Sequence, residues 1–173
     1  FTIQKNEKIK KIKELSEFTF GLILSSFRNL VNGTEAVKSG NWRDQEQYIR
    51  GNQMYKKTIG IIGFGRIGEN IFNYAKAFGM KVIAYDPYKI KKLKKLKIFA
   101  NLNQLLSSAD IVTVCVHLDN RTKLMCDDNF FHKMKKNSIF VNTSRGEIVK
   151  ENSLVKALNS KKVKSAAVDV VQN

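Results

Sequence analysis

Short apolar runs alternate with amphipathic segments along most of this chain. TIGIIGF, residues 58–64, has the near-continuous branched side chains of a strand that is buried on both faces. RIGENIFNYAKAFGM, residues 66–80, has helical spacing of its apolar residues and ends near Gly79. The same alternation predicts further strands at residues 81–86, 110–118, 138–144 and 164–171, and further helices at residues 102–109, 127–134 and 150–161. Strands that alternate with helices in this way indicate an α/β domain with a doubly wound parallel sheet.

A longer helical pattern precedes the first strand. Ser16 is a candidate cap for a helix that runs to about Val31, and Gly33 follows as a stop. One face of this helix is apolar and carries Phe20, Ile23, Leu24, Phe27, Leu30 and Val31. The pattern divides the chain into a Lys-rich lead-in, residues 1–15, and one domain, residues 16–173, that begins with a long helix.

Composition fits a globular domain but adds a strong charge. The chain has 173 residues, is 43% hydrophobic and carries a net charge of +16. Of its basic residues, 25 are Lys and only 6 are Arg, whereas base readers and phosphate clamps depend on the Arg fork. We therefore expect no nucleic-acid partner, although an anion or nucleic-acid binder driven by charge is an alternative. It would lose affinity as salt is added.

The lysines crowd most densely at residues 88–99, YKIKKLKKLKIF. This segment is either a local anion-attracting patch or a solvated amphipathic helix whose inward residues are Ile90, Leu93 and Leu96/Ile98. No apolar run reaches the ~20 residues of a membrane span, so we expect no membrane partner. Cys115 and Cys126 give neither a disulfide framework nor a metal-site spacing, which predicts a cytoplasmic protein without a metal.

The first strand runs into a glycine motif of the form GxGxxG. Gly63 would permit a tight turn, Gly65 the close approach of a pyrophosphate, and Gly68 the packing of helix on strand. The following helix would direct its N-terminal N–H groups at the phosphates. Asp86 ends the next strand, where a carboxylate accepts hydrogen bonds from the ribose hydroxyls and repels a 2′-phosphate. The sequence thus predicts a Rossmann-type fold that binds NAD in preference to NADP.

Three segments resemble the D-isomer-specific 2-hydroxyacid dehydrogenases, the group that includes D-3-phosphoglycerate dehydrogenase. They are GIIGFGRIGENIFNYAKAFGMKVIAYDPY, the helix SEFTFGLILSSFRNL, and FVNTSRGEIVKENSLVKALNSKKVKSAAVDV with its N-x-x-R-G turn and A-x-D-V strand. The resemblance implies the NAD-binding domain of an oxidoreductase. That enzyme would transfer a hydride between NAD(H) and a D-2-hydroxy or 2-keto acid, possibly 3-phosphoglycerate.

The resemblance also implies roles for single residues. Arg145 becomes the catalytic residue that clamps the carboxylate or carbonyl of the acid and polarises it. Asp169 would contact the nicotinamide carboxamide. The other expected cofactor contacts are Arg66 and Ile67 at the pyrophosphate, Thr143 and Ser144 at the nicotinamide, and Val116, His117 and Thr122 on a loop beside the cofactor.

The acid/base His of the family and its Glu partner follow the A-x-D-V strand, so we expect them beyond Asn173 and this chain alone to be inactive. We likewise expect the substrate-binding domain to lie outside it. His117 either lines the cofactor site or is an ordinary loop residue, and His132 is expected on a helix surface. The resemblance further implies a homodimer formed through the leading helix, whose Phe-rich face suits a partner. The alternative function is an NAD-sensing interaction module without turnover.

Overall fold

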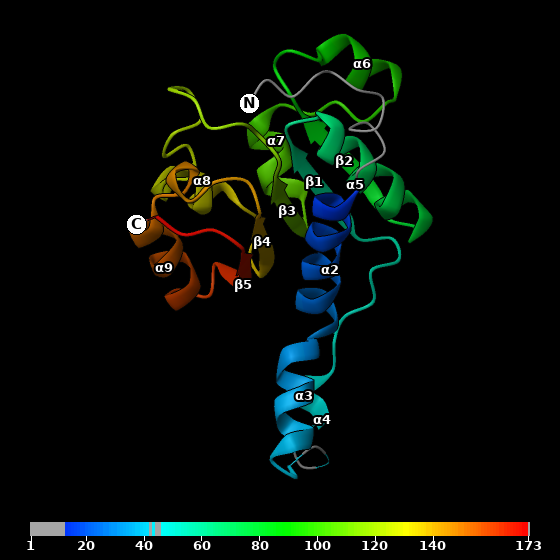
Figure 1. Ribbon diagram of the computed structural model, residues 1–173, viewed down its shortest axis with the longest axis vertical. Helices are drawn as coiled ribbons and strands as arrows, with labels where there is room; N and C mark the ends of the chain where they lie inside the picture. Colours follow the sequence, from blue (N-terminus) through cyan, green and yellow to red (C-terminus); the bar gives the residue numbers. More distant parts are fainter. Residues whose placement is uncertain (1–12, 42, 44–45, 173) are drawn as a thin grey trace, which may run out of the picture.

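The computed structural model describes residues 13–41, 43 and 46–172, and is drawn in Figure 1. Most of the lead-in expected at residues 1–15 therefore lies outside the described residues. Within them, the core is a five-stranded parallel sheet in the order β2-β1-β3-β4-β5. The strands are β1 Thr58–Ile62, β2 Lys81–Tyr85, β3 Ile111–Val114, β4 Ser138–Asn142 and β5 Val163–Val168. The predicted α/β fold with a parallel sheet is confirmed.

Helices cover both faces of this sheet (Figure 1). Their bounds are α2 Glu14–Arg28, α3 Leu30–Lys38, α4 Glu46–Ile49, α5 Arg66–Ala77, α6 Ile90–Lys95, α7 Leu102–Ser108, α8 Asp128–Lys133 and α9 Glu151–Asn159, with a 3₁₀ turn η1 at Gly146–Ile148. Side chains of α2 and α5 share one core with β1 and β4, and those of α7, α8 and α9 share a second core with β3 and β4. Two cores on opposite faces are the doubly wound arrangement that the alternating pattern predicts.

A short segment extends the sheet beyond β2. Phe99 forms a parallel bridge with Ala84, and the backbone bonds run from Ala84 N to Ile98 O (2.7 Å) and from Ala100 N to Ala84 O (3.0 Å). With this segment counted as a strand, the order becomes 3-2-1-4-5-6, the Rossmann order. The strands that follow β1 are added first on its β2 side and then, from β3 on, on its other side, so the strand order switches between β1 and β3. Such folds bind their ligands at this switch point.

The leading helix differs from the prediction. It begins at Glu14, so Ser16 is not its cap but a buried residue of α2, and it breaks at Asn29, which has φ +56°. Asn tolerates this left-handed conformation better than most residues, and its side chain donates to Ile49 O at 3.2 Å. The helix then resumes as α3, which runs through Gly33 instead of stopping there.

The break changes which apolar residues face inward. Phe20, Ile23 and Phe27 are buried within the chain itself, whereas Leu30 and Val31 are 54% and 66% exposed. The Phe-rich face expected to meet a partner is therefore occupied by the core of the same chain. In Figure 1, α3 and α4 extend away from the sheet.

The Lys-rich segment is helical only over α6. Leu93 and Ile98 are buried as expected, but Ile90 and Leu96 are 39% and 40% exposed. Leu96 is the C-cap of α6, and the left-handed turn at Lys97, with φ +56°, then directs the chain back to β2 so that Ile98 and not Leu96 faces the core. The expectation of an inward position was wrong for Ile90, and of the pair Leu96/Ile98 it holds for Ile98.

Asp110, which directly precedes β3, links the amino-terminal ends of β1, β3 and β4. Its carboxylate accepts the Thr58 N–H at 2.8 Å and pairs with Lys135 Nζ at 2.7 Å. Partial burial alone would raise the pKa of Asp110, but the bonds from Lys135 and Thr58 and the charges of Lys135 and Lys57 outweigh it and lower that pKa. A lowered carboxyl pKa means that the ionised group stabilises the fold at neutral pH and that this contribution is lost as acid protonates it.

We expect Asp110→Ala to lower the free energy of unfolding by about 2 kcal/mol at pH 7, because it removes two hydrogen bonds to a charged group. The difference from the parent should shrink as the pH falls below 4, where the parent also loses its carboxylate. Urea unfolding at both pH values measures this. Glu35→Ala is the control, because the ion pair of Glu35 with Lys38 is exposed on both sides. An equal loss at the two pH values would contradict the charge-based account.

Candidate functional site

The carboxyl ends of the five strands lie in one row. The register pairs Tyr85 with Ile62, Ile62 with Val114, Val114 with Asn142, and Asn142 with Val168. Every residue predicted to touch cofactor or substrate follows one of these strand ends or opens α5. The structure thus brings the whole predicted set to one edge of the sheet, which is the ligand edge of open α/β folds.

Two glycines of the motif are required by close contacts. Gly63 has φ +91°, and a Cβ on it would lie 2.7 Å from Cys115 O and 2.9 Å from Val116 Cγ1. A Cβ on Gly68 would lie 2.3 Å from Gly63 O, so α5 can approach the loop only with glycine there. These contacts match the predicted roles of Gly63 in the turn and Gly68 in packing helix on strand.

Gly65 is different, because nothing in the protein fills the space beside it. A Cβ on Gly65 would meet no atom within 4 Å, and its φ of −77° does not demand glycine. It is also the N-cap of α5, and no side chain caps the first turn. An uncapped helix N-terminus beside an open space fits the pyrophosphate of a dinucleotide. Arg66 and Ile67 open this helix, with Arg66 exposed and Ile67 partly buried against the core.

Asp86 and Lys89 together hold the glycine loop. Asp86 Oδ2 accepts the Phe64 N–H at 2.9 Å, and Lys89 Nζ donates to Phe64 O at 3.0 Å. Asp86 Oδ1 accepts the Tyr88 N–H at 2.9 Å. Since a carboxylate has about four acceptor positions, Asp86 keeps capacity for ribose hydroxyls. Lys89 was missed from the sequence, because one lysine in a Lys-rich run carries no signal of its own.

The loop after β3 is braced by its own side chains. Thr122 Oγ1 donates to His117 O at 2.6 Å, and the Asp119 carboxylate accepts the N–H groups of Arg121 and Thr122. These backbone bonds lower the pKa of Asp119. His117 is exposed at the start of this loop, and Thr122 uses its hydroxyl to shape the loop.

Arg121 also hydrogen-bonds Tyr88 Oη, so the loop that follows β3 meets the one that follows β2. β1 lies between those two strands in the sheet. Val116, partly buried, lies against Gly63 at the same edge.

The turn after β4 carries the expected substrate residue. Asn142 is fully buried and closes the turn, because its Nδ2 donates to Arg145 O at 2.9 Å and its Oδ1 accepts the Ser144 N–H at 3.0 Å. Ser144 Oγ donates to Val114 O at 2.9 Å and so ties the turn to β3. Thr143 is buried between them. A buried Asn three residues before Arg145 was visible in the sequence as part of N-x-x-R-G, but its bonding to the turn was not.

Arg145 lies exposed at the end of this turn. Its Nη1 donates to Ser144 O at 2.7 Å, and a guanidinium has five N–H donors, so capacity remains for a carboxylate ligand. Asp169 is exposed at the end of β5, and its N–H bonds Asn142 O at 3.1 Å. Arg145, in the turn after β4, and Asp169, directly after the neighbouring strand β5, thus both bond Asn142 through their backbones.

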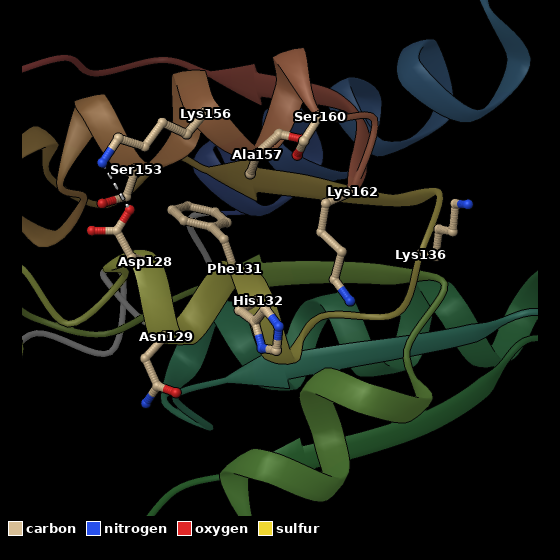
Figure 2. Close-up of a pocket in the computed structure, with 10 residues that line it drawn as sticks. All are labelled: Asp128, Asn129, Phe131, His132, Lys136, Ser153, Lys156, Ala157, Ser160 and Lys162. Carbon is tan, nitrogen blue, oxygen red and sulfur yellow. Dashed lines mark hydrogen bonds and ion pairs between the residues drawn. The ribbon is translucent and has the colours of Figure 1, made fainter.

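A second surface feature, away from this edge, is formed by α8 and α9. A groove of about 690 Å³ lies between α8 and α9, and none of the predicted site residues lines it (Figure 2). His132 faces that groove from the exposed surface of α8, as expected. Burial raises the pKa of Cys115 to about 12, so its thiol is not a nucleophile at neutral pH.

The residues that the structure describes contain neither a candidate metal site nor a membrane-spanning helix. Among them, no group of three His, Cys, Asp or Glu side chains could hold a metal ion. In the same part of the chain, no helix has both the length and the apolar character needed to cross a bilayer.

Comparison with known proteins gives the family. The model of the "D-isomer specific 2-hydroxyacid dehydrogenase, NAD binding domain" matches residues 20–173. D-3-phosphoglycerate dehydrogenase of Methanocaldococcus jannaschii is 38% identical over 161 residues, which cover 91% of this chain and 30% of that protein. Hydroxypyruvate reductase of Thermotoga maritima is 34% identical over 158 residues, which cover 91% of this chain and 51% of that protein. The chain therefore spans about half, or less, of the length of these relatives.

Solved structures agree with the sequence relatives. D-lactate dehydrogenase from Aquifex aeolicus, complexed with NAD and lactic acid, has a TM-score of 0.86 and 31% identity over 93% of this chain and 48% of its own. NAD-dependent formate dehydrogenase from Staphylococcus aureus, in complex with NAD, has a TM-score of 0.84 and 32% identity over 91% and 48%. The predictions of the family and of NAD as the cofactor are confirmed. This chain belongs to the D-isomer-specific 2-hydroxyacid dehydrogenases and is an NAD-binding domain of that family.

Proposed function

We propose that this domain serves an enzyme that oxidises a D-2-hydroxy acid or reduces the corresponding 2-keto acid. NAD(H), when bound, supplies or accepts the hydride. The observation that carries the proposal is the common row of strand ends, which puts the glycine loop and the turn of Arg145 on one edge of the sheet. Residues 16–173 form the dinucleotide-binding unit in this proposal, and a further domain reads the substrate.

The residues of this edge have separate roles in the proposal. The first turn of α5 and the open space at Gly65 hold the pyrophosphate. Asp86 accepts the ribose hydroxyls and disfavours a 2′-phosphate by charge repulsion. Thr143, Ser144 and Asp169 border the nicotinamide. The same border includes the loop residues Val116, His117 and Thr122.

Arg145 binds the carboxylate of the acid through paired N–H donors, as a planar guanidinium does best. It also stabilises the negative charge that develops on the substrate oxygen. The proton for that oxygen comes from an acid/base His outside this chain in the proposal.

The substrate is a small 2-hydroxy acid, with 3-phosphoglycerate as the first candidate. Relatives at 34–38% identity carry the names D-3-phosphoglycerate dehydrogenase and hydroxypyruvate reductase. We place the protein in the cytoplasm, because both described cysteines are free thiols. An NAD-sensing module without turnover is the second candidate, and it shares the cofactor edge but needs no substrate at Arg145.

Turnover by the complete protein separates the two candidates. We would follow NADH oxidation at 340 nm with hydroxypyruvate, glyoxylate, pyruvate and 3-phosphohydroxypyruvate, each at ~1 mM. The proposal expects saturable turnover with at least one of these acids. NADH binding without turnover on any of them would favour the sensing module.

We further propose a homodimer through the leading helices. Both α2 and α3 carry exposed apolar side chains: Phe18 on α2 is 48% exposed, and Val31 and Val37 on α3 are 66% and 62% exposed. Exposed apolar residues on two consecutive helices suit burial against a second copy of the chain. We expect Val31→Glu to shift the protein from dimer to monomer in sedimentation velocity. Asn32→Glu, at an exposed position of α3 that faces away from Val31 and Val37, should leave it dimeric. A monomeric parent at 50 µM, on the order of cellular abundance for a metabolic enzyme, would contradict the dimer.

A further inference from the structure

A buried pair of hydroxyls links α2 to the turn that carries Arg145. Thr19 Oγ1 lies 2.8 Å from Thr143 Oγ1, although the two residues are 124 positions apart. Thr19 is 0% exposed and Thr143 is 5% exposed, so water does not compete for this bond. A buried hydroxyl that loses its partner carries the full cost of desolvation.

The direction of the hydrogen bond follows from the second contact of Thr19. Its hydroxyl donates to Leu15 O at 2.6 Å, one turn earlier in α2. A hydroxyl has one proton, so the proton between the two threonines must come from Thr143. The bonds form a chain from Thr143 through Thr19 to the backbone of α2, and this chain fixes the rotamer of Thr143.

Thr143 lies inside the turn that Asn142 closes. Asn142 bonds the carbonyl of Arg145 and the N–H of Ser144, the residues that follow Thr143. Because the turn is short and Thr143 is at its centre, holding the Thr143 side chain also limits the movement of the backbone that bears Arg145. The bond therefore couples a helix outside the sheet to the position of the guanidinium.

A second polar contact anchors α2 close to the first. Asn70 Nδ2 donates to Ser16 Oγ at 3.1 Å, and Ser16 is 0% exposed. Asn70 belongs to α5, the helix whose N-terminus meets the glycine loop. Thus α2 contacts the cofactor helix through Ser16 and the Arg145 turn through Thr19, one helical turn apart.

We propose that Thr19 is a positioning residue for substrate binding, acting through Thr143 on Arg145. It touches neither the cofactor nor the acid. This inference rests on the proposed role of Arg145 as the residue that binds the acid. It predicts that loss of the Thr19 hydroxyl weakens the use of the keto acid much more than the binding of NADH, because the glycine loop, which holds the pyrophosphate, does not contact Thr19.

Thr19→Val tests the inference, since valine keeps the shape and removes the acceptor. In this chain, we expect hydrogen exchange of the Ser144 amide to become about tenfold faster, the effect of losing one buried hydrogen bond. In the complete enzyme, we expect the KM for the keto acid to rise about tenfold with little change in the Kd of NADH. A general loss of stability would raise both constants together.

Two variants serve as controls. Thr19→Ser keeps the hydroxyl and should restore exchange and KM to nearly the values of the parent. Thr34→Val removes a similar bond, from Thr34 Oγ1 to Leu30 O at 2.8 Å, at an exposed site of α3. It should behave like the parent, which separates the tertiary contact from any general effect of valine in a helix.

The inference is overturned if Thr19→Val shows the exchange of the parent at Ser144 and an unchanged KM. If Thr19→Val folds poorly, the double variant Thr19→Val/Thr143→Val replaces it and is measured by hydrogen exchange at the Ser144 amide. It leaves no orphaned hydroxyl and should fold better, while the exchange stays fast. Exchange as slow as in the parent would overturn the inference too. If the parent enzyme reduces no 2-keto acid, the proposed function fails, and exchange at Ser144 still decides whether Thr19 holds the turn.

Discussion

We expect Gly65→Ala to weaken NADH binding at least about 100-fold, a loss of ~2.8 kcal/mol, without unfolding the domain. A Cβ at this position meets no protein atom within 4 Å, and the backbone there has φ −77°, which alanine adopts easily. The methyl group would instead occupy the space that the pyrophosphate needs in order to reach the first turn of α5. Calorimetric titration with NADH and a thermal melt measure the two parts of this prediction.

Matched glycine variants make the result specific. Gly21→Ala also adds a methyl group with no neighbour within 4 Å, but on α2, and should bind NADH as the parent does. Gly63→Ala should destabilise the fold itself, because Gly63 has φ +91° and its Cβ would lie 2.7 Å from Cys115 O. Unchanged NADH affinity in a fully folded Gly65→Ala protein would contradict a pyrophosphate site at this loop.

The second large effect is expected from Arg145→Ala in the complete enzyme. We expect kcat/KM for the keto acid to fall about 1,000-fold, ~4 kcal/mol, because the variant removes both the carboxylate clamp and the charge that stabilises the developing oxyanion. The Kd of NADH should change little, since Arg145 follows β4 and the glycine loop follows β1. Steady-state kinetics together with NADH titration separate the two constants.

Two further substitutions define how Arg145 acts. Arg145→Lys keeps the charge but loses the planar fork, so it should recover only part of the activity. Arg50→Ala removes an exposed Arg that pairs with Glu46 in the segment before β1 and not with any residue of the site. It should leave the kinetics unchanged. Near-parental kcat/KM in Arg145→Ala would remove this residue from the substrate site.

Much of the fold and of the site could be predicted because both depend on local patterns. Runs such as Ile59–Ile62 identify strands buried on both faces, and Gly79 with φ +68° ends α5 as a helix-stop glycine should. Parallel strands align their carboxyl ends, so residues that directly follow the strands lie at one edge of the sheet. This can be predicted once the strands themselves are recognised in the sequence. That rule alone brings Gly63, Asp86 and Arg145 to one edge.

The features that could not be predicted depend on single side chains that meet over long sequence distances. The break at Asn29 depends on a left-handed residue that is stabilised by a bond to Ile49, and neither is visible as a periodic pattern. The bond of Lys89 to Phe64 O is hidden in a run of lysines. The Thr19–Thr143 bond spans 124 positions, and each threonine alone is an ordinary helix or turn residue.

The most direct test of the account is a calorimetric titration of this chain with NADH and with NADPH at ~0.15 M salt, where exposed charges are screened beyond ~8 Å. We expect saturable NADH binding that is at least about tenfold tighter than NADPH binding, because the Asp86 carboxylate repels a 2′-phosphate. Equal affinity for the two cofactors, or no binding of either, would contradict it. Affinity that disappears at this salt concentration would instead indicate a charge-driven anion binder, given the net charge of +16.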